Sequence, residues 1–314
     1  MDPSIAFGPV PSRRLGRSLG INNIPPKVCT YSCIYCQVGR TIDMQTGRRA
    51  FYEPERIQRA VQERVEKVTK AEETIDFLTF VPDGEPTLDV NLDREIDRLK
   101  SLGIKIAVIS NSSLLSHQDV HEDLLKSDLV SVKIDAVTPR TWRMINRPIG
   151  SLHLPEILHG VLEFAKIYDG KLVTETMLIN DVNSDENEIG EIADFIAELK
   201  PFKAYLSVPT RPPALKWVQT PKADAVNRSY QIFKEHIDRV EYLIGYEGNE
   251  FSSTGHIEQD LLSITAVHPL REDAVENLLS HARAKWDVVH NLMKKNLIKK
   301  EAYEGRMFYL RNIR

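Results

Sequence analysis

The sequence predicts an α/β protein built around a parallel sheet, with a small, separate C-terminal part. Two observations carry this prediction. Short β-branched and aromatic runs alternate with amphipathic stretches of ten or more residues, and this alternation stops before residues 256–314. Strands separated by helices of that length form right-handed βαβ units, so their strands run parallel. A chain of 314 residues is long enough for one large domain with an appendix.

The predicted elements begin with a loop over residues 1–28, where four prolines exclude a long helix and leave room for one short extended piece. Five strands follow, so the sheet should hold six. That number alone is compatible with a partial barrel or a doubly wound sheet, and both place the site at the carboxyl ends of the strands. The strands are expected over 74–81, 104–109, 129–135, 172–179 and 204–208, and helices over 54–70, 90–102, 138–146, 154–167, 185–199 and 221–237.

The C-terminal part has a different pattern. Residues 209–255 are predicted to connect it to the sheet, ending in a turn through Ser252, Ser253 and Gly255. Helices are expected over 272–281 and 284–295, followed by a hairpin whose strands, 297–300 and 306–311, flank Glu304-Gly305. This order is typical of a winged helix. The predicted domains are therefore 1–255 and a winged-helix-like 256–314, which would contact either nucleic acid or protein.

Charge is distributed unevenly along the chain. Residues 1–50 carry seven Lys/Arg and two Asp/Glu, residues 271–314 carry ten and six, and the middle carries 24 and 37. The two terminal segments are therefore basic and the middle segment is acidic. This distribution is typical either of a protein that binds an anionic partner such as RNA or of ordinary solvated termini. No apolar run is long enough for a membrane span, and the first residues lack the apolar core of a signal peptide. We therefore expect a cytoplasmic protein without membrane contact, in a compartment where thiols stay reduced.

All three cysteines lie in one stretch, Cys29, Cys33 and Cys36, with the spacing C-x3-C-x2-C. Thiolates are the ligands of iron–sulfur clusters, and a four-iron cluster normally takes four of them. Three leave one iron open to bind a small molecule. A structural zinc would need a fourth ligand, and the first histidine is His117. A redox-active cysteine pair is the other alternative, but it leaves one cysteine unexplained.

Polar residues follow the predicted strands where a ligand should sit. Arginine side chains, whose planar forks suit phosphate and carboxylate, occur just before the cysteines and after the last strand. The residues that we single out at the strand ends are Gly84, Glu85, Pro86, Asn111, Lys133 and Asp135, and the candidate substrate contacts are Arg13, Arg14, Arg17 and Arg211.

The cysteine spacing, with Tyr35 before the last cysteine, resembles the signature of the radical S-adenosylmethionine (SAM) superfamily. Gly84-Glu85-Pro86 resembles its GGEP motif, with Asp83 in place of the first glycine. The resemblance implies a partial (β/α)6 barrel, a [4Fe–4S] cluster on the three cysteines and SAM on the open iron. It further implies that the reduced cluster cleaves SAM to a 5′-deoxyadenosyl radical, which takes hydrogen from a substrate. The residues implied to contact SAM are Tyr35, Gly84, Glu85, Pro86, Asn111, Lys133 and Asp135.

Within the superfamily, the residues before and after the cysteines resemble the Fe–S oxidoreductase group related to the wyosine-base synthases, which act on tRNA. Those synthases carry further cysteines for a second cluster, and this chain has none. RNA is therefore one candidate substrate. A protein substrate, as in glycyl-radical activases, and a non-enzymatic iron–sulfur regulator are the alternatives. The resemblance also implies an electron donor such as a flavodoxin or ferredoxin.

Overall fold

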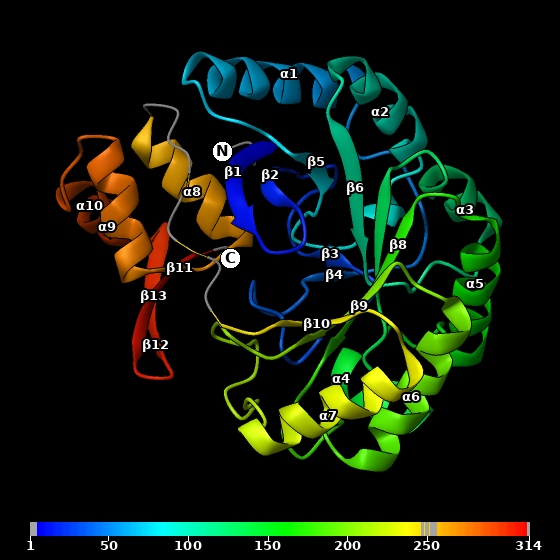
Figure 1. The fold of residues 1–314 in the computed structure, drawn as a ribbon. Coiled ribbons are helices and arrows are strands. Elements are labelled where there is room, and N and C mark those ends of the chain that lie inside the picture. Colours follow the sequence, from blue (N-terminus) through cyan, green and yellow to red (C-terminus); the bar gives the residue numbers. More distant parts are fainter. Residues whose placement is uncertain (1–4, 246–247, 249–250, 252–255, 313–314) are drawn as a thin grey trace.

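The computed structural model describes residues 5–245, 248, 251 and 256–312. Its main body is a curled eight-stranded sheet, which confirms the predicted α/β partial barrel (Figure 1). The strand order is β1-β2-β5-β6-β7-β8-β9-β10, and every neighbouring pair is parallel except β1 and β2. The strands are β1 (Ala6–Ser12), β2 (Gly16–Ile21), β5 (Phe77–Phe80), β6 (Lys105–Ser110), β7 (Leu129–Lys133), β8 (Lys171–Met177), β9 (Lys203–Ser207) and β10 (Val240–Leu243).

Two of these strands lie beyond the six that were predicted. Residues 1–28 form an antiparallel hairpin of β1 and β2 where a loop with one extended piece was expected. Pro9 and Pro11 are compatible with β1 because it is an edge strand, where a missing amide hydrogen is tolerated. β10, assigned to the connector, instead pairs with β9 at the opposite edge. A run of four residues that includes the polar Glu241 is too short to be recognised as a strand from the sequence.

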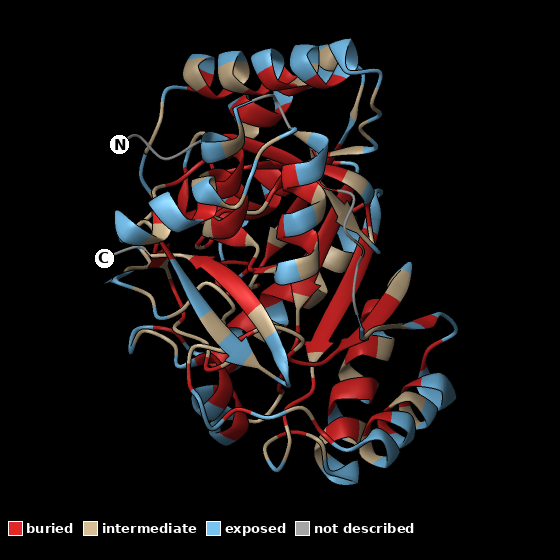
Figure 2. Cartoon of the chain, turned by 90° about the vertical axis from the view of Figure 1, so that its left-hand side faces the viewer, coloured by how far each residue is buried: buried red, intermediate tan, exposed pale blue. Residues whose placement is uncertain are grey.

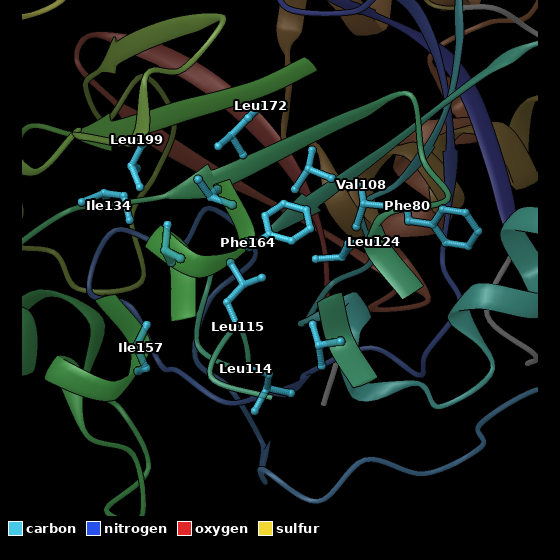
Figure 3. Packing of buried hydrophobic residues seen from close by; sticks show 14 of the residues in the cluster. Phe80, Val108, Leu114, Leu115, Leu124, Ile134, Ile157, Phe164, Leu172 and Leu199 are labelled. Atoms are coloured by element: carbon cyan, nitrogen blue, oxygen red, sulfur yellow. The ribbon is translucent and has the colours of Figure 1, made fainter. Parts of the chain in front are cut away.

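Helices cover the outer face of the sheet (Figure 1). Figure 2 shows them buried on the side that faces the strands and exposed on the other, as the amphipathic patterns predict. Figure 3 shows Leu124 and Phe164, from two of these helices, beside Val108 of β6. The helices are α1 (Pro54–Lys70), α2 (Leu92–Leu99), α3 (Gln118–Leu124), α4 (Pro139–Asn146), α5 (Leu154–Ile167), α6 (Glu186–Leu199) and α7 (Ala223–His236), with short 3-10 turns η1 (Pro86–Leu88) and η2 (Lys100–Leu102).

The C-terminal residues form a second cluster of elements beside the β1–β2 hairpin (Figure 1). The two predicted helices and the hairpin are present, while one helix and one short strand before them were not predicted. A buried ion pair of 3.1 Å between Arg64 and Asp260 joins this part to α1. Its elements are α8 (Ile257–Val267), β11 (Leu270–Arg271), α9 (Glu272–His281), α10 (Asp287–Lys294), β12 (Ile298–Tyr303) and β13 (Arg306–Arg311), with the sheet order β11-β13-β12.

The winged-helix assignment and the division at residue 255 stay predictions. The expected turn through Ser252, Ser253 and Gly255 lies outside the described residues. Across the ranges that are described, no helix has both the length and the apolar character needed to cross a membrane.

Candidate functional site

A cavity of about 300 Å³ lies at the carboxyl ends of the strands, inside the curl of the sheet. The last residues of β6, β7, β8, β9 and β10 and the segments after β5, β6, β9 and β10 contribute to its wall, as does the cysteine loop. This is the place that both candidate architectures predict for a site. Among the residues singled out from the sequence, those that line the cavity are Arg14, Cys29, Cys33, Tyr35, Cys36, Gly84, Glu85, Asn111, Lys133 and Arg211.

The cysteine loop begins at β3 (Val28–Cys29), which pairs with β4 (Asp43–Met44). The last residues of α4 hold the loop through backbone hydrogen bonds. The amide of Ser32 donates to the carbonyl of Asn146 (3.1 Å), and the amide of Ile34 donates to that of Ile145 (2.9 Å). Because these bonds involve only backbone groups, they fix the loop while leaving the three thiols free to face the cavity.

The surroundings of the three thiols fit metal-bound sulfur. Burial, with a further contribution from Asp135, raises the pKa of Cys33 to about 12, and burial also raises the pKa of the Cys29 and Cys36 thiols. Nothing here makes them thiolates by itself, so deprotonation needs a bound metal. Two side-chain amides point at sulfur: Asn111 Nδ2 lies 3.4 Å from Cys29 Sγ and Asn146 Nδ2 lies 3.5 Å from Cys33 Sγ. Such donors stabilise negative charge on cluster sulfurs.

A single metal ion fits the same residues less well. In the described part of the chain, no three His, Cys, Asp or Glu side chains are arranged around one ion position. Each thiolate of a [4Fe–4S] cluster binds a different iron, so the sulfurs need not meet at one point. The geometry therefore favours the cluster over the zinc alternative.

The Gly84-Glu85-Pro86 turn follows β5 and packs directly on the cysteine loop. A Cβ atom at position 84 would lie 1.9 Å from the Val28 carbonyl oxygen, so only glycine allows this approach. The Glu85 carboxylate accepts hydrogen bonds from Thr87, from Ser110 Oγ (2.9 Å) and from the Asn111 amide (2.7 Å). Burial nevertheless raises its pKa. Glu85 thus ties together the ends of β5 and β6 at the cavity wall.

Asp83, which departs from the GGEP pattern, has its own partner. Its carboxylate lies 3.0 Å from the ammonium group of Lys27, and both side chains are almost fully buried. Burial raises the pKa of Asp83 to about 6, and Lys27 opposes that rise. The pair lines the cavity next to Cys36, so the departure adds a neutralised ion pair rather than an isolated charge.

Asp135 and Pro86 do not line the cavity. The Asp135 carboxylate accepts hydrogen bonds from the Tyr35 hydroxyl, from Asn146 Nδ2 (2.8 Å) and from the Met177 amide (2.9 Å). It therefore orients Tyr35 and Asn146, which both lie at the cysteine loop. Asn146 was not singled out from the sequence, because only the fold brings the end of α4 to this loop.

Glu175 is a cavity residue that the sequence reasoning missed. It lies in β8 and binds Lys133 Nζ (3.0 Å), Ser207 Oγ (3.0 Å) and the guanidinium of Arg14. Burial alone would raise its pKa, but Arg14 and Lys133 lower it to about 2. The ammonium of Lys133 also lies 4.8 Å from the centre of the Tyr35 ring. A charged network thus occupies the floor of the cavity.

This network predicts a pH-dependent loss of stability in Glu175→Gln. Removing one member of a buried ion network costs about 3–5 kcal/mol in the free energy of unfolding at pH 7. The folded pKa of Glu175 is depressed, so its contribution is present above the unfolded pKa and disappears as pH falls toward 2. Urea unfolding at pH 7 and at successively lower pH should show the two proteins converging. Glu241→Gln, in an exposed pair with Lys203, is the control and should stay within about 0.5 kcal/mol.

The candidate arginines are only partly brought together. Arg14 reaches the cavity from the hairpin turn at the amino end of β2. Arg17 instead pairs with Glu73, and Arg13 donates to the carbonyl of Ile244; neither lines the cavity. The hairpin explains this outcome, because it places these arginines at the opposite end of β2 from the cysteine loop.

Arg211 lines the cavity at its C-terminal side. It donates to Gln37 Oε1 (3.0 Å), directly after the last cysteine, and lies 2.9 Å from His268 Nε2. Burial and Arg211 lower the pKa of His268 well below its usual range, so the imidazole is neutral and accepts this hydrogen bond. Gln37 Nε2 in turn donates to the carbonyl of Val267 (2.9 Å). The end of α8 is therefore joined to the cysteine loop.

A curled parallel sheet with a three-cysteine loop and a Gly-Glu-Pro turn at the carboxyl ends of its strands defines the radical SAM class. Sequence comparison agrees: the family model "Radical SAM superfamily" matches residues 23–196, and the chain belongs to this superfamily of enzymes. The UPF0026 protein MJ1312 of Methanocaldococcus jannaschii is 46% identical over 313 residues, which is 99% of this chain and 97% of that protein.

Solved structures show the same fold at low sequence identity. The structure of TYW1 with a lysine-pyruvate adduct bound has a TM-score of 0.51 and 18% identity, covering 70% of this chain and 74% of that one. SuiB of Streptococcus suis, bound to the precursor peptide SuiA, has a TM-score of 0.53 and 13% identity, covering 72% and 49%. The predicted superfamily, its relation to the wyosine-base synthases, of which TYW1 is one, and the cofactors [4Fe–4S] and SAM are thereby confirmed.

Proposed function

We propose that this chain binds a [4Fe–4S] cluster through Cys29, Cys33 and Cys36, reductively cleaves SAM to a 5′-deoxyadenosyl radical, and uses it to abstract hydrogen from RNA. The observation that carries the chemistry is the convergence of three free thiols, Glu85 and Asn111 on one cavity. When bound, the cluster supplies the electron and the open iron. We also propose a cytoplasmic location, because such a cluster needs reducing surroundings.

The protein's own residues would hold the methionine part of SAM against the open iron. Among the described residues, Glu85 Oε2 accepts one hydrogen bond, from the Asn111 amide, and so retains a lone pair for an ammonium group. Lys133 and Arg14 are cations at the cavity wall that suit a carboxylate. Asp135 acts through Tyr35 and Asn146 as a positioning residue. Arg211 and the end of α8 form the side at which a larger substrate would enter.

One anaerobic assay tests the chemistry. The reconstituted protein is given SAM and dithionite, and 5′-deoxyadenosine is measured by chromatography. We expect it to accumulate. A protein with a full, reducible [4Fe–4S] cluster that forms none would refute the proposed enzyme and leave an iron–sulfur regulator as the better description.

Basic side chains in the C-terminal part support RNA as the substrate class. Lys294, Lys295 and Lys300 are exposed, and no acidic side chain of the described residues pairs with them. They lie at the end of α10, directly after it, and on β12, in the same part of the chain whose α8 joins the cysteine loop. A basic surface linked to the cavity fits a polyanion that reaches the radical.

Neutralising this surface should weaken RNA binding. For Lys294→Gln/Lys295→Gln, removal of two phosphate contacts should flatten the salt dependence, reducing the slope of log affinity against log salt by about 2 for structured RNA. Filter binding of bulk tRNA at several salt concentrations measures this slope. Lys67→Gln/Lys70→Gln, on α1, is the matched control and should behave as wild type. If tRNA does not bind the wild type at all, a protein substrate replaces RNA.

A further inference from the structure

A second groove lies against the outside of the cysteine loop. Ser32, between the first two cysteines, lines it, as does Arg40 shortly after the third. The loop residues next to these two, Tyr31, Cys33 and Thr41, line the SAM cavity instead. The two cavities share no lining residue. The cysteine loop is therefore a wall with the cavity on one face and this groove on the other.

The groove is basic. Arg40, Arg143, Arg147 and His153 line it, all are exposed, and no Asp or Glu is among its lining residues. In the described part of the chain, none of the three arginine side chains has a hydrogen bond or an ion pair. Asp43, next to the groove residue Met44, lies 3.7 Å from a different arginine, Arg49. The arginines thus present uncompensated positive charge to solvent.

The remaining lining residues are mostly apolar. Met44, Pro148, Ile149 and Leu152 also line the groove, alongside Ser32 and Gly150. An apolar surface with charged residues around it is the arrangement of a protein–protein contact that is steered by charge. A small anion would need no apolar surface, and a nucleic-acid backbone would make most of its contacts to the charges alone.

We propose that this groove, lined by Ser32, Arg40, Arg143, Arg147 and His153, is the docking site of an acidic one-electron donor protein. The proposal rests on the function proposed above. A donor seated here would contact the loop that carries the three cysteines, and it would leave the cavity free for SAM and substrate. One electron leaves the donor's reduced flavin or iron–sulfur centre, which is oxidised by one electron, and the cluster passes from the +2 to the +1 state.

Charge and location together favour a donor protein over RNA at this face. An RNA substrate must bring a base or sugar to the cavity, and this groove shares no lining residue with the cavity. The exposed lysines of the C-terminal part are connected to the cavity side through α8 and Gln37. The two basic surfaces are therefore assigned to different partners.

The test uses reconstituted full-length protein and a purified flavodoxin as the donor. Binding of oxidised flavodoxin is followed by anisotropy of its flavin, and cluster reduction by reduced flavodoxin is followed by stopped-flow absorbance. In Arg40→Glu/Arg143→Glu we expect flavodoxin affinity and the reduction rate to fall about 10–100-fold, most strongly at low salt. Arg59→Glu/Lys70→Glu, on the exposed face of α1, makes the same change in net charge and should retain wild-type values.

Dithionite separates this proposal from the function on which it rests, because a small anion needs no docking surface. The groove variant should still form 5′-deoxyadenosine with dithionite while failing with flavodoxin. Equal losses in the groove variant and its control, or no loss in either, would overturn the docking site. Loss of tRNA binding instead of flavodoxin binding would reassign the groove to RNA. Absence of 5′-deoxyadenosine from the wild type with dithionite would refute the enzyme, and flavodoxin binding would still report on the groove.

Discussion

Cys33→Ala is expected to abolish both the cluster and the formation of 5′-deoxyadenosine. The chain has three cysteines in all, so no spare thiol can replace the missing one. Two thiolates do not hold a four-iron cluster, which normally takes four protein ligands and here has three. Iron and sulfide content, the absorbance of the reconstituted protein and the deoxyadenosine assay measure the loss.

The fold should survive this change. Cys33 packs at the edge of the main core, and α4 holds the loop through backbone hydrogen bonds that alanine retains. The circular dichroism spectra of the two cluster-free proteins should therefore coincide. Ser32→Ala, one residue away, keeps all three thiols and should keep the cluster. A full cluster in Cys33→Ala would mean that another residue supplies a ligand, and the assignment of Cys33 would have to be withdrawn.

The residues that sequence reasoning found share one property: their position is set by local chain order. Glu85 lies in the turn that follows β5 and Asn111 comes directly after β6, and the carboxyl ends of parallel strands meet at one edge. The helix α1 was predicted with the bounds that it has, because Pro54 starts it and Ile57 and Val61 repeat on one face. Local signals of this kind place a residue without knowledge of the rest of the fold.

Residues that were missed depend on contacts between distant segments. Gln37 and His268 meet Arg211 only because α8 packs beside the cysteine loop, and nothing near any of them in the sequence indicates this. The role of Glu175, in contrast, could have been predicted from the sequence. A carboxylate in the middle of a strand buried on both faces is costly unless it is paired, and that is a reason to expect a charged network.

The positions of Arg14 and Arg17 also depend on the fold and do not follow from their order in the chain. Both were predicted to contact the substrate because they lie just before the cysteines in sequence. The turn between β1 and β2, which carries Arg14, instead lies at the amino end of β2. Arg14 reaches the cavity from that end and binds Glu175, while Arg17 pairs with Glu73. Closeness in sequence was a poor guide because a strand of six residues separates the turn from the loop.

Glu85→Ala is expected to keep the cluster and to weaken SAM binding. The thiols are ligands independently of Glu85, so iron content should be unchanged. The substitution leaves Ser110 Oγ and the Asn111 amide without their acceptor and frees the end of β6 to move. The lost ammonium contact, a hydrogen bond to a charged group worth about 1.5–3 kcal/mol, corresponds to a SAM Kd raised about 10–150-fold.

Equilibrium dialysis of labelled SAM against the reconstituted variant measures this Kd, and cluster absorbance is recorded on the same samples. Glu188→Ala removes a carboxylate that also accepts from threonine hydroxyls, Thr138 and Thr141, but on α6 and outside the cavity. It should bind SAM as the wild type does. Glu85→Gln keeps one acceptor oxygen but turns an amide toward existing donors, so its Kd should lie between wild type and alanine. If Glu85→Ala binds SAM normally with a full cluster, the Gly84-Glu85-Pro86 turn contributes only to the fold, and SAM recognition must be assigned to Lys133, Arg14 and the backbone.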